Sequence, residues 1–149
     1  MTRYFEDFTV GETATFGSYR VTAEEVTEFA REYDPQPFHV DREAAAASIY
    51  GGLIASGWHT CAMAMRLIVD HLLAETACLG ALGVDDLRFL RPVRPGDELS
   101  VRVEVVDTDP DGSQPDRGLV RAGTTVMNQD DEAVLSYEAV LMFARREAA

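Results

Sequence analysis

The chain has 149 residues, 46% of them hydrophobic and 9% aromatic, which is typical of a folded globular protein and excludes a disordered one. A formal net charge of −13 argues against a broad surface for nucleic acid or for an anionic membrane, and two cysteines are too few for a disulfide framework. We expect residues 1–149 to form one domain, because this length buries a sizeable core without disulfides or metals.

We expect neither a secretion signal nor a membrane segment. Residues 1–7 lack the apolar core of a signal peptide. The longest apolar run, residues 61–74, is interrupted by Arg66, Asp70 and His71. The sequence therefore predicts a cytoplasmic protein whose partners include neither a membrane nor nucleic acid.

The first predicted elements are a strand over residues 14–21 and a helix that begins after Thr22. Glu25 follows Thr22 at the spacing of a capping box. Apolar side chains then recur at helical spacing, at Val26, Phe29, Ala30 and Tyr33. Pro35 ends this helix and leaves Asp34 at its carboxyl end.

Residues 34–39 are predicted to form a rigid, irregular loop, because Pro35 and Pro37 disfavour both a regular helix and a central strand. Asp34 and His39 stand at the two ends of this loop. Held in this way they could share one water molecule, with one group accepting a proton while the other donates one. The spacing also fits a structural role, in which Asp34 caps a turn and His39 is a hydrogen-bonded, half-buried histidine.

Two further helices are predicted before the strands begin. A short helix capped by Asp41 extends to residue 47, and a loop with paired glycines follows at residues 48–52. Ser56 is placed to cap a long helix over residues 57–74. This helix is apolar nearly all round, which predicts that other elements wrap it rather than leave it on the surface.

Strands dominate the second half of the chain. Residues 99–105 alternate between apolar and polar side chains, the pattern of a half-buried strand. A proline-glycine turn at 91–97 precedes this strand, and a polar loop at 107–118 follows it. Residues 119–127 and 133–143 are predicted to form a closing antiparallel pair. Together these elements predict an α+β fold, with a single antiparallel sheet curled around a long central helix.

Three ordered motifs of the chain resemble the MaoC-like dehydratase family, the R-specific enoyl-CoA hydratases of the hotdog fold. They are the segments 34–41, 54–57 and 89–97, which read Asp-Pro-Gln-Pro-Phe-His-Val-Asp, Ile-Ala-Ser-Gly and Phe-Leu-Arg-Pro-Val-Arg-Pro-Gly-Asp. The resemblance extends from Phe5 to Phe143. It implies a single hotdog domain.

The resemblance implies that Asp34 and His39 are an acid/base pair that adds water to a trans-2-enoyl thioester to give an (R)-3-hydroxyacyl thioester. It also implies that the backbone N–H of Gly57 binds the thioester oxygen. The first N–H groups of a helix suit this task, because they lack internal partners and carry positive potential. Substrate contacts are expected from the remaining motif residues and from the residue after Gly57, namely Gln36, Phe38, Ser56, Trp58, Arg91 and Arg94.

Two positions depart from the family pattern. Gln36 stands where the family usually has Asn, and Ser56 stands where many members have His. These departures bear on substrate identity and leave two alternatives open. One is a hotdog thioesterase, in which the same loop activates water against the thioester carbonyl, and the other is a non-catalytic subunit that binds acyl thioesters.

Two of the expected substrate contacts have alternative roles. Arg91 and Arg94 belong, with Arg88, to the densest basic cluster of the chain, which would meet the phosphates of coenzyme A or balance nearby acids. Trp58 would line a tunnel for the acyl chain and shorten it, or it would fill the core against the sheet.

We expect no metal and no cofactor apart from the coenzyme A of the substrate. His59 and His71 lie on one predicted helix without the Cys, Asp or Glu partners of a metal site. A homodimer or an assembly of dimers is expected, because a lone curled sheet leaves an edge strand open to water.

Overall fold

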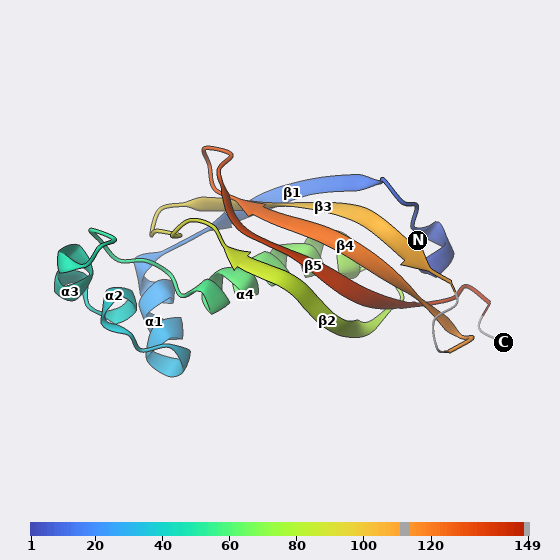
Figure 1. Cartoon of the computed structure of the whole chain (residues 1–149), viewed down its shortest axis with the longest axis horizontal. Helices are drawn as coiled ribbons and strands as arrows, with labels where there is room; N and C mark the ends of the chain where they lie inside the picture. Colours follow the sequence, from blue (N-terminus) through green and yellow to red (C-terminus); the bar gives the residue numbers. More distant parts are fainter. Residues whose placement is uncertain (111–113, 148–149) are drawn as a thin grey trace.

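The computed structural model describes residues 1–110 and 114–147. Figure 1 shows a curled sheet packed against a long helix, with shorter helices gathered at one end. The elements in chain order are η1 (Phe5–Asp7), β1 (Thr13–Arg20), α1 (Ala23–Tyr33), α2 (Pro37–Val40), α3 (Arg42–Ala47), α4 (Gly57–Ile68), the π-helical turn η2 (Val69–Leu73), β2 (Cys78–Phe89), β3 (Glu98–Asp109), β4 (Arg117–Met127) and β5 (Ala133–Ala144).

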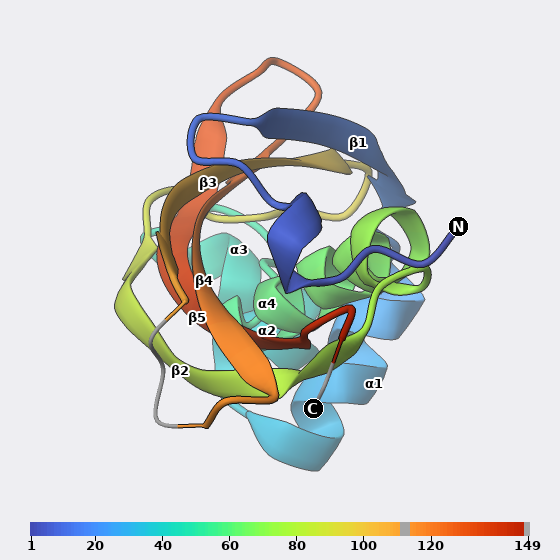
Figure 2. The same cartoon turned by 90° about the vertical axis from the view of Figure 1, so that its right-hand side faces the viewer.

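The five strands form one sheet in the order β1-β3-β4-β5-β2, with every neighbouring pair antiparallel. Figure 2 looks along the sheet and shows it bending from β1, past α4, to β2. The predicted α+β architecture is therefore confirmed. β1 and β2 are the two edges, and among the described residues β2 pairs only with β5.

The main core lies between the inner face of α4 and the concave face of the sheet. Alternate residues of β3, including Leu99 and Val101, are fully buried, as the period-two pattern predicted. They pack in one cluster with Met63 and Leu67 of α4. Each such side chain contributes about 1.5–3 kcal/mol by leaving water. This burial fixes the axis of α4 and directs its amino terminus toward α1–α3 (Figure 1).

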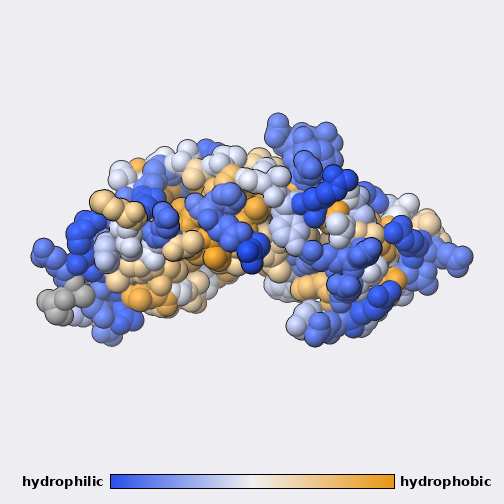
Figure 3. All heavy atoms as spheres, turned by 180° about the vertical axis from the view of Figure 1, so that it is seen from behind, coloured by the Kyte–Doolittle hydropathy of each residue, from blue (hydrophilic) through white to orange (hydrophobic). Residues whose placement is uncertain are grey.

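The prediction that other elements wrap α4 is wrong for the single chain. The sheet covers one side of the helix, and Trp58, Met65 and Val69 remain exposed on the other. Figure 3 shows apolar atoms grouped near the middle of the molecule on this side. Apolar composition predicted burial but could not show which side the sheet covers. The predicted helical stretch also changes at Val69, where the α-helix ends and η2 begins.

The helix starts follow the predicted capping for two of three helices. The Thr22 side chain accepts a hydrogen bond from the Glu25 N–H, and Asp41 accepts from the first turn of α3. Ser56, in contrast, makes no capping hydrogen bond, so that prediction is wrong. The first N–H groups of α4 are therefore not occupied by this side chain.

The segment over residues 34–39 is more regular than predicted. Pro37 begins the one-turn helix α2, which contains His39. Proline is tolerated at the first position of a helix, because the N–H that it lacks would have no intrahelical partner there. Pro37 therefore begins a turn of helix instead of preventing one.

The strands are longer than their sequence patterns indicated. β3 continues to Asp109 and β4 begins at Arg117, so the predicted polar loop at 107–118 is shorter, and its residues 111–113 lie outside the described residues. Within the described ranges, no helix is both long and apolar enough to cross a membrane.

Candidate functional site

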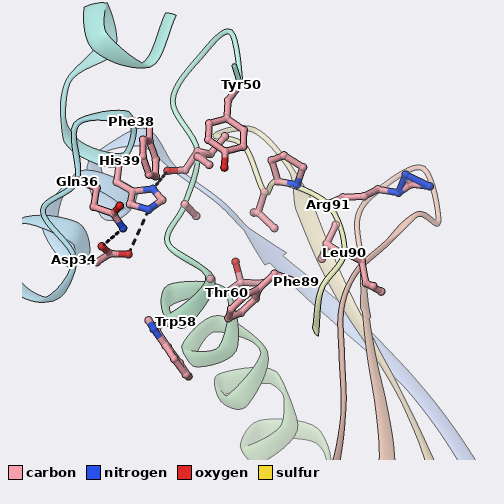
Figure 4. Close-up of a pocket in the computed structure, with 16 residues that line it drawn as sticks. Asp34, Gln36, Phe38, His39, Tyr50, Trp58, Thr60, Phe89, Leu90 and Arg91 are labelled. Carbon is pink, nitrogen blue, oxygen red and sulfur yellow. Dashed lines mark hydrogen bonds and ion pairs between the residues drawn. The ribbon is translucent and has the colours of Figure 1, made fainter. Parts of the chain in front are cut away.

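A pocket of about 420 Å³ opens where the α1–α2 connection, the start of α4 and the β2–β3 connection meet (Figure 4). It is lined by Asp34, Gln36, Phe38, His39, Tyr50, Ile54, Ala55, Gly57, Trp58, Thr60, Phe89, Leu90, Arg91, Pro92, Val93 and Val134. Few of these side chains are ionisable. The pocket therefore combines an apolar wall with a small number of placed polar groups, as small-molecule sites generally do.

His39 is held with one ring nitrogen facing Asp34. The side chain is buried, and its Nδ1 lies 2.7 Å from the carbonyl oxygen of Ile54. A carbonyl oxygen only accepts, so Nδ1 carries a proton and donates it. The N–H of Ile54 in turn donates to the carbonyl of Phe38, which ties the two segments together. Nε2 is therefore the atom of His39 that is left for proton transfer.

Asp34 faces His39 from the carboxyl end of α1. Its Oδ2 lies 3.3 Å from Nε2 of His39, and its Oδ1 accepts a 2.6 Å hydrogen bond from the Gln36 amide. Burial raises the pKa of Asp34, but the Gln36 amide, the Ser56 hydroxyl and His39 outweigh it and hold this pKa below its ordinary value. Asp34 is therefore an ionised carboxylate that is ready to accept a proton.

Ser56 stabilises Asp34 from the start of α4. Its side chain is fully buried, and its hydroxyl forms no well-aligned hydrogen bond with the described residues. It nevertheless lies close enough to the Asp34 carboxylate to lower the pKa of that group. The Ser56 hydroxyl thus lowers the pKa of the carboxylate that would do the chemistry, instead of capping its own helix.

Gly57 is the first residue of α4 and lines the pocket. Its N–H donates to no acceptor among the described residues. A Cβ at this position would lie 2.5 Å from the Phe89 ring, so only glycine fits without displacing that ring. The N–H and the helix dipole together create positive potential at the pocket wall. Such a site stabilises an oxygen that gains negative charge.

The structure brings most of the predicted site residues together. Asp34, Gln36, Phe38, His39, Gly57, Trp58 and Arg91 all line the pocket. Trp58 is 60% exposed at the rim and meets Phe89 edge-on, which excludes the alternative that it fills the core. Arg91 extends away from the acid/base pair and lies 3.7 Å from Glu132 (Figure 4).

Arg94, a predicted substrate contact, is not among the residues that line the pocket. Its guanidinium donates to the carbonyl of Tyr50 instead, at 2.7 Å. Arg88 pairs with Asp86 on the same strand. The density of arginines in the sequence suggested a site for an anion. In the structure these arginine side chains instead contact a nearby carbonyl and nearby carboxylates.

Sequence reasoning missed nine of the lining residues, among them Tyr50, Ile54, Thr60 and Phe89. Tyr50 packs against Phe38, and its hydroxyl is directed into the pocket (Figure 4). Ile54 acts through its backbone carbonyl, which no side-chain motif reveals. The only available signal for Tyr50 was its place beside the paired glycines of the loop.

No group of three or more His, Cys, Asp or Glu side chains within residues 1–110 and 114–147 is arranged to hold a metal ion. The cysteines Cys61 and Cys78 are both free. The polar side chains that line the pocket are those of Asp34, Gln36, His39, Tyr50, Trp58, Thr60 and Arg91.

Comparison with known proteins supports this fold. The chain is 31% identical over 148 residues to a 3-hydroxybutyryl-CoA dehydratase of Methylorubrum extorquens, covering 98% of this chain and 87% of that one. It is 41% identical to a MaoC-like dehydratase of Rhodospirillum rubrum, whose crystal structure superimposes with a TM-score of 0.87 over 97% of this chain and 98% of that one.

Two other solved structures are also similar. An R-hydratase of Pseudomonas aeruginosa is 28% identical, with a TM-score of 0.78 over 97% of this chain and 88% of that one. A protein of Mycobacterium tuberculosis with a double hotdog fold is 20% identical and has a TM-score of 0.84 over 99% of this chain and 46% of that one, which shows the hotdog fold. The family model described as MaoC-like domain matches residues 7–128, and the chain belongs to that family.

Proposed function

We propose that this protein adds water to a trans-2-enoyl-CoA-type thioester to give an (R)-3-hydroxyacyl thioester, and catalyses the reverse dehydration. Its family relatives include a 3-hydroxybutyryl-CoA dehydratase and an R-hydratase, which support a hydro-lyase. The observation that carries the proposal is the placement of Asp34 and His39. An ionised carboxylate and an imidazole nitrogen lie 3.3 Å apart, in the same pocket as an unoccupied helix N–H.

In the hydration direction, Asp34 accepts a proton from water as the water oxygen bonds to C3 of the substrate. In this scheme His39 starts as the imidazolium, with its Nδ1–H on the Ile54 carbonyl and its Nε2–H toward the Asp34 carboxylate. The Nε2–H donates its proton to C2 as the C2–C3 double bond becomes single. Asp34 then returns the proton to His39 across the short gap between them, which restores the starting state. The lowered pKa of Asp34 keeps this group ionised, which is the state that the base of the reaction requires.

The Gly57 N–H supplies the third element of this mechanism. As water adds at C3, negative charge moves onto the thioester oxygen before C2 is protonated. A helix N–H that points at this oxygen stabilises that charge without reorganising, because the backbone is already in place. No cofactor enters this scheme, and coenzyme A is only the carrier part of the substrate.

A turnover screen of enoyl thioesters of varied length tests the proposed function. Loss of the conjugated double bond and release of free thiol are followed together. Hydration removes the double bond and leaves the thiol esterified, whereas a thioesterase releases thiol. Tight binding without either change would contradict the enzyme and support a binding subunit.

Replacing Trp58 with Ala is expected to extend the range of accepted acyl chains. Trp58 stands at the pocket rim beside Gly57, where its ring limits the space next to α4. Each additional methylene that the pocket buries is worth about 0.8 kcal/mol, so activity should fall sharply once the space is filled. Specificity constants across a series of chain lengths measure this limit. Identical profiles for the native protein and Trp58→Ala would exclude Trp58 as the limiting residue.

The protein is expected to sediment as a homodimer whose subunits pair along β2. The outer edge of β2 is unpaired in the single chain, and its Leu82 and Val84 are more than half exposed. The uncovered side of α4 adds further apolar surface (Figure 3). Open edges and apolar patches of this kind are usually covered.

Analytical ultracentrifugation measures the assembly state. Leu82→Glu should weaken the dimer, whereas Val10→Glu, at a similarly exposed position in the connection between η1 and β1, should not. A stable and active native monomer at assay concentration would contradict the dimer.

A further inference from the structure

His59 is a buried histidine outside the pocket that joins α4 to α1. Only 3% of its surface is exposed. Its Nε2 lies 3.2 Å from Oε1 of Glu25, and its ring stacks on Phe29 with the centroids 4.6 Å apart and the planes 7° from parallel. Glu25 and Phe29 both belong to α1. One side chain of α4 therefore contacts α1 through a polar bond and a ring stack at once.

The contact extends to the sheet. Oε1 of Glu25 also accepts a hydrogen bond from the Tyr19 hydroxyl on β1. Since a carboxylate only accepts, Nε2 of His59 carries the proton, and Nδ1 is left as a buried acceptor without a hydrogen-bond partner in the described chain. A buried acceptor without a partner is costly, so an apolar residue would pack here at lower cost. The imidazole at this position therefore points to a role beyond filling space.

The same two helices carry the candidate site. Asp34 is the residue that ends α1, and Gly57 is the residue that begins α4, two positions before His59. Ser56, which stabilises Asp34, also belongs to the start of α4. The distance from the Asp34 carboxylate to the Gly57 N–H therefore depends on how α1 sits against α4.

We propose that His59 is a positioning residue, which holds α1 against α4 so that Asp34 stays in register with Ser56 and with the oxyanion N–H of Gly57. The catalytic consequence of this proposal rests on the proposed function. The placement of Asp34, in contrast, can be measured without turnover. A misplacement of about 1 Å at reacting groups costs up to about a hundredfold in rate.

The test compares His59→Leu with His59→Gln. Leucine fills the space and removes the polar bond, whereas the glutamine amide can still donate to Glu25. His71→Leu is the matched control, because His71 lies further along in η2, is exposed and does not contact α1. Thermal denaturation of each variant first shows that it folds.

In His59→Leu, kcat is expected to fall about tenfold with KM little changed, whereas His59→Gln and His71→Leu stay within about threefold of the native protein. The decisive readout is the pKa of Asp34, followed by carboxyl NMR titration. The neighbouring groups that lower the pKa of Asp34 are Gln36, Ser56 and His39. If α1 shifts away from Ser56, the pKa of Asp34 rises toward its ordinary value in His59→Leu and not in His59→Gln.

The charged and titratable groups around His59 itself are Glu25 and Tyr19, with Glu28, Glu32, Tyr33 and Arg66 lining the same cavity. Burial lowers the pKa of His59 and raises the pKa of Tyr19 to about 12, so both are neutral at neutral pH. An unchanged Asp34 pKa in His59→Leu, with only a lower melting temperature, would overturn the positioning role. Absence of hydration by the native protein would instead overturn the proposed function, and the titration would still decide the role of His59.

Discussion

Replacing Asp34 with Asn, or His39 with Ala, is expected to lower hydration of an enoyl thioester by about a hundredfold to ten-thousandfold. In Asp34→Asn, the new amide could still accept the hydrogen bond from Gln36 but could not take a proton from water. Removing the His39 ring takes away the Nε2 that faces Asp34 at 3.3 Å. Steady-state kinetics with a substrate that the native protein hydrates measure both losses.

The fold should survive both changes, since each affected group faces a pocket and not the main core. Asp70→Asn and His71→Ala are suitable controls, because both residues are exposed in η2, away from the pocket lining. Native-like turnover in Asp34→Asn or in His39→Ala would remove that residue from the acid/base pair. Circular dichroism separates such a result from simple unfolding.

The sequence predicted what depends on local physical chemistry. The caps at Thr22 and Asp41, the end of α1 before Pro35 and the alternation in β3 each involve residues close together in the chain. The pair Asp34 and His39 was also predictable, because a short segment bounded by a helix end brings them near each other. The segment that brings Asp34 and His39 near each other contains one turn of helix, α2, and is not an irregular loop.

The remainder depends on contacts between distant segments. The Ile54 carbonyl that fixes the His39 tautomer and the Phe89 ring that rests on Gly57 come from other parts of the chain. The hydrogen bond from the Arg94 guanidinium to the Tyr50 carbonyl likewise joins segments that are far apart in the chain. The apolar composition of α4 predicted burial on all sides, but the outer side of this helix is left uncovered by the sheet of its own chain.

Replacing Gly57 with Pro is expected to lower kcat about a hundredfold to a thousandfold relative to Gly57→Ala. Proline removes the N–H that is proposed to bind the thioester oxygen. Proline is well tolerated at the first position of a helix, and the preceding Ser56 has the extended backbone that a following proline requires, with φ −57° and ψ 140°. The exchange therefore deletes one donor while keeping the helix start.

Gly57→Ala is the matched control, because it introduces the same Cβ and keeps the N–H. Since that Cβ would lie 2.5 Å from the Phe89 ring, both substitutions are best compared in a Phe89→Ala background, where the clash is absent. Phe89 is more than half exposed, so its truncation opens little core. If the Ala and Pro variants share the same kcat in that background, the thioester oxygen is bound by a group other than Gly57. A selective loss in the Pro variant assigns the oxyanion interaction to this one N–H.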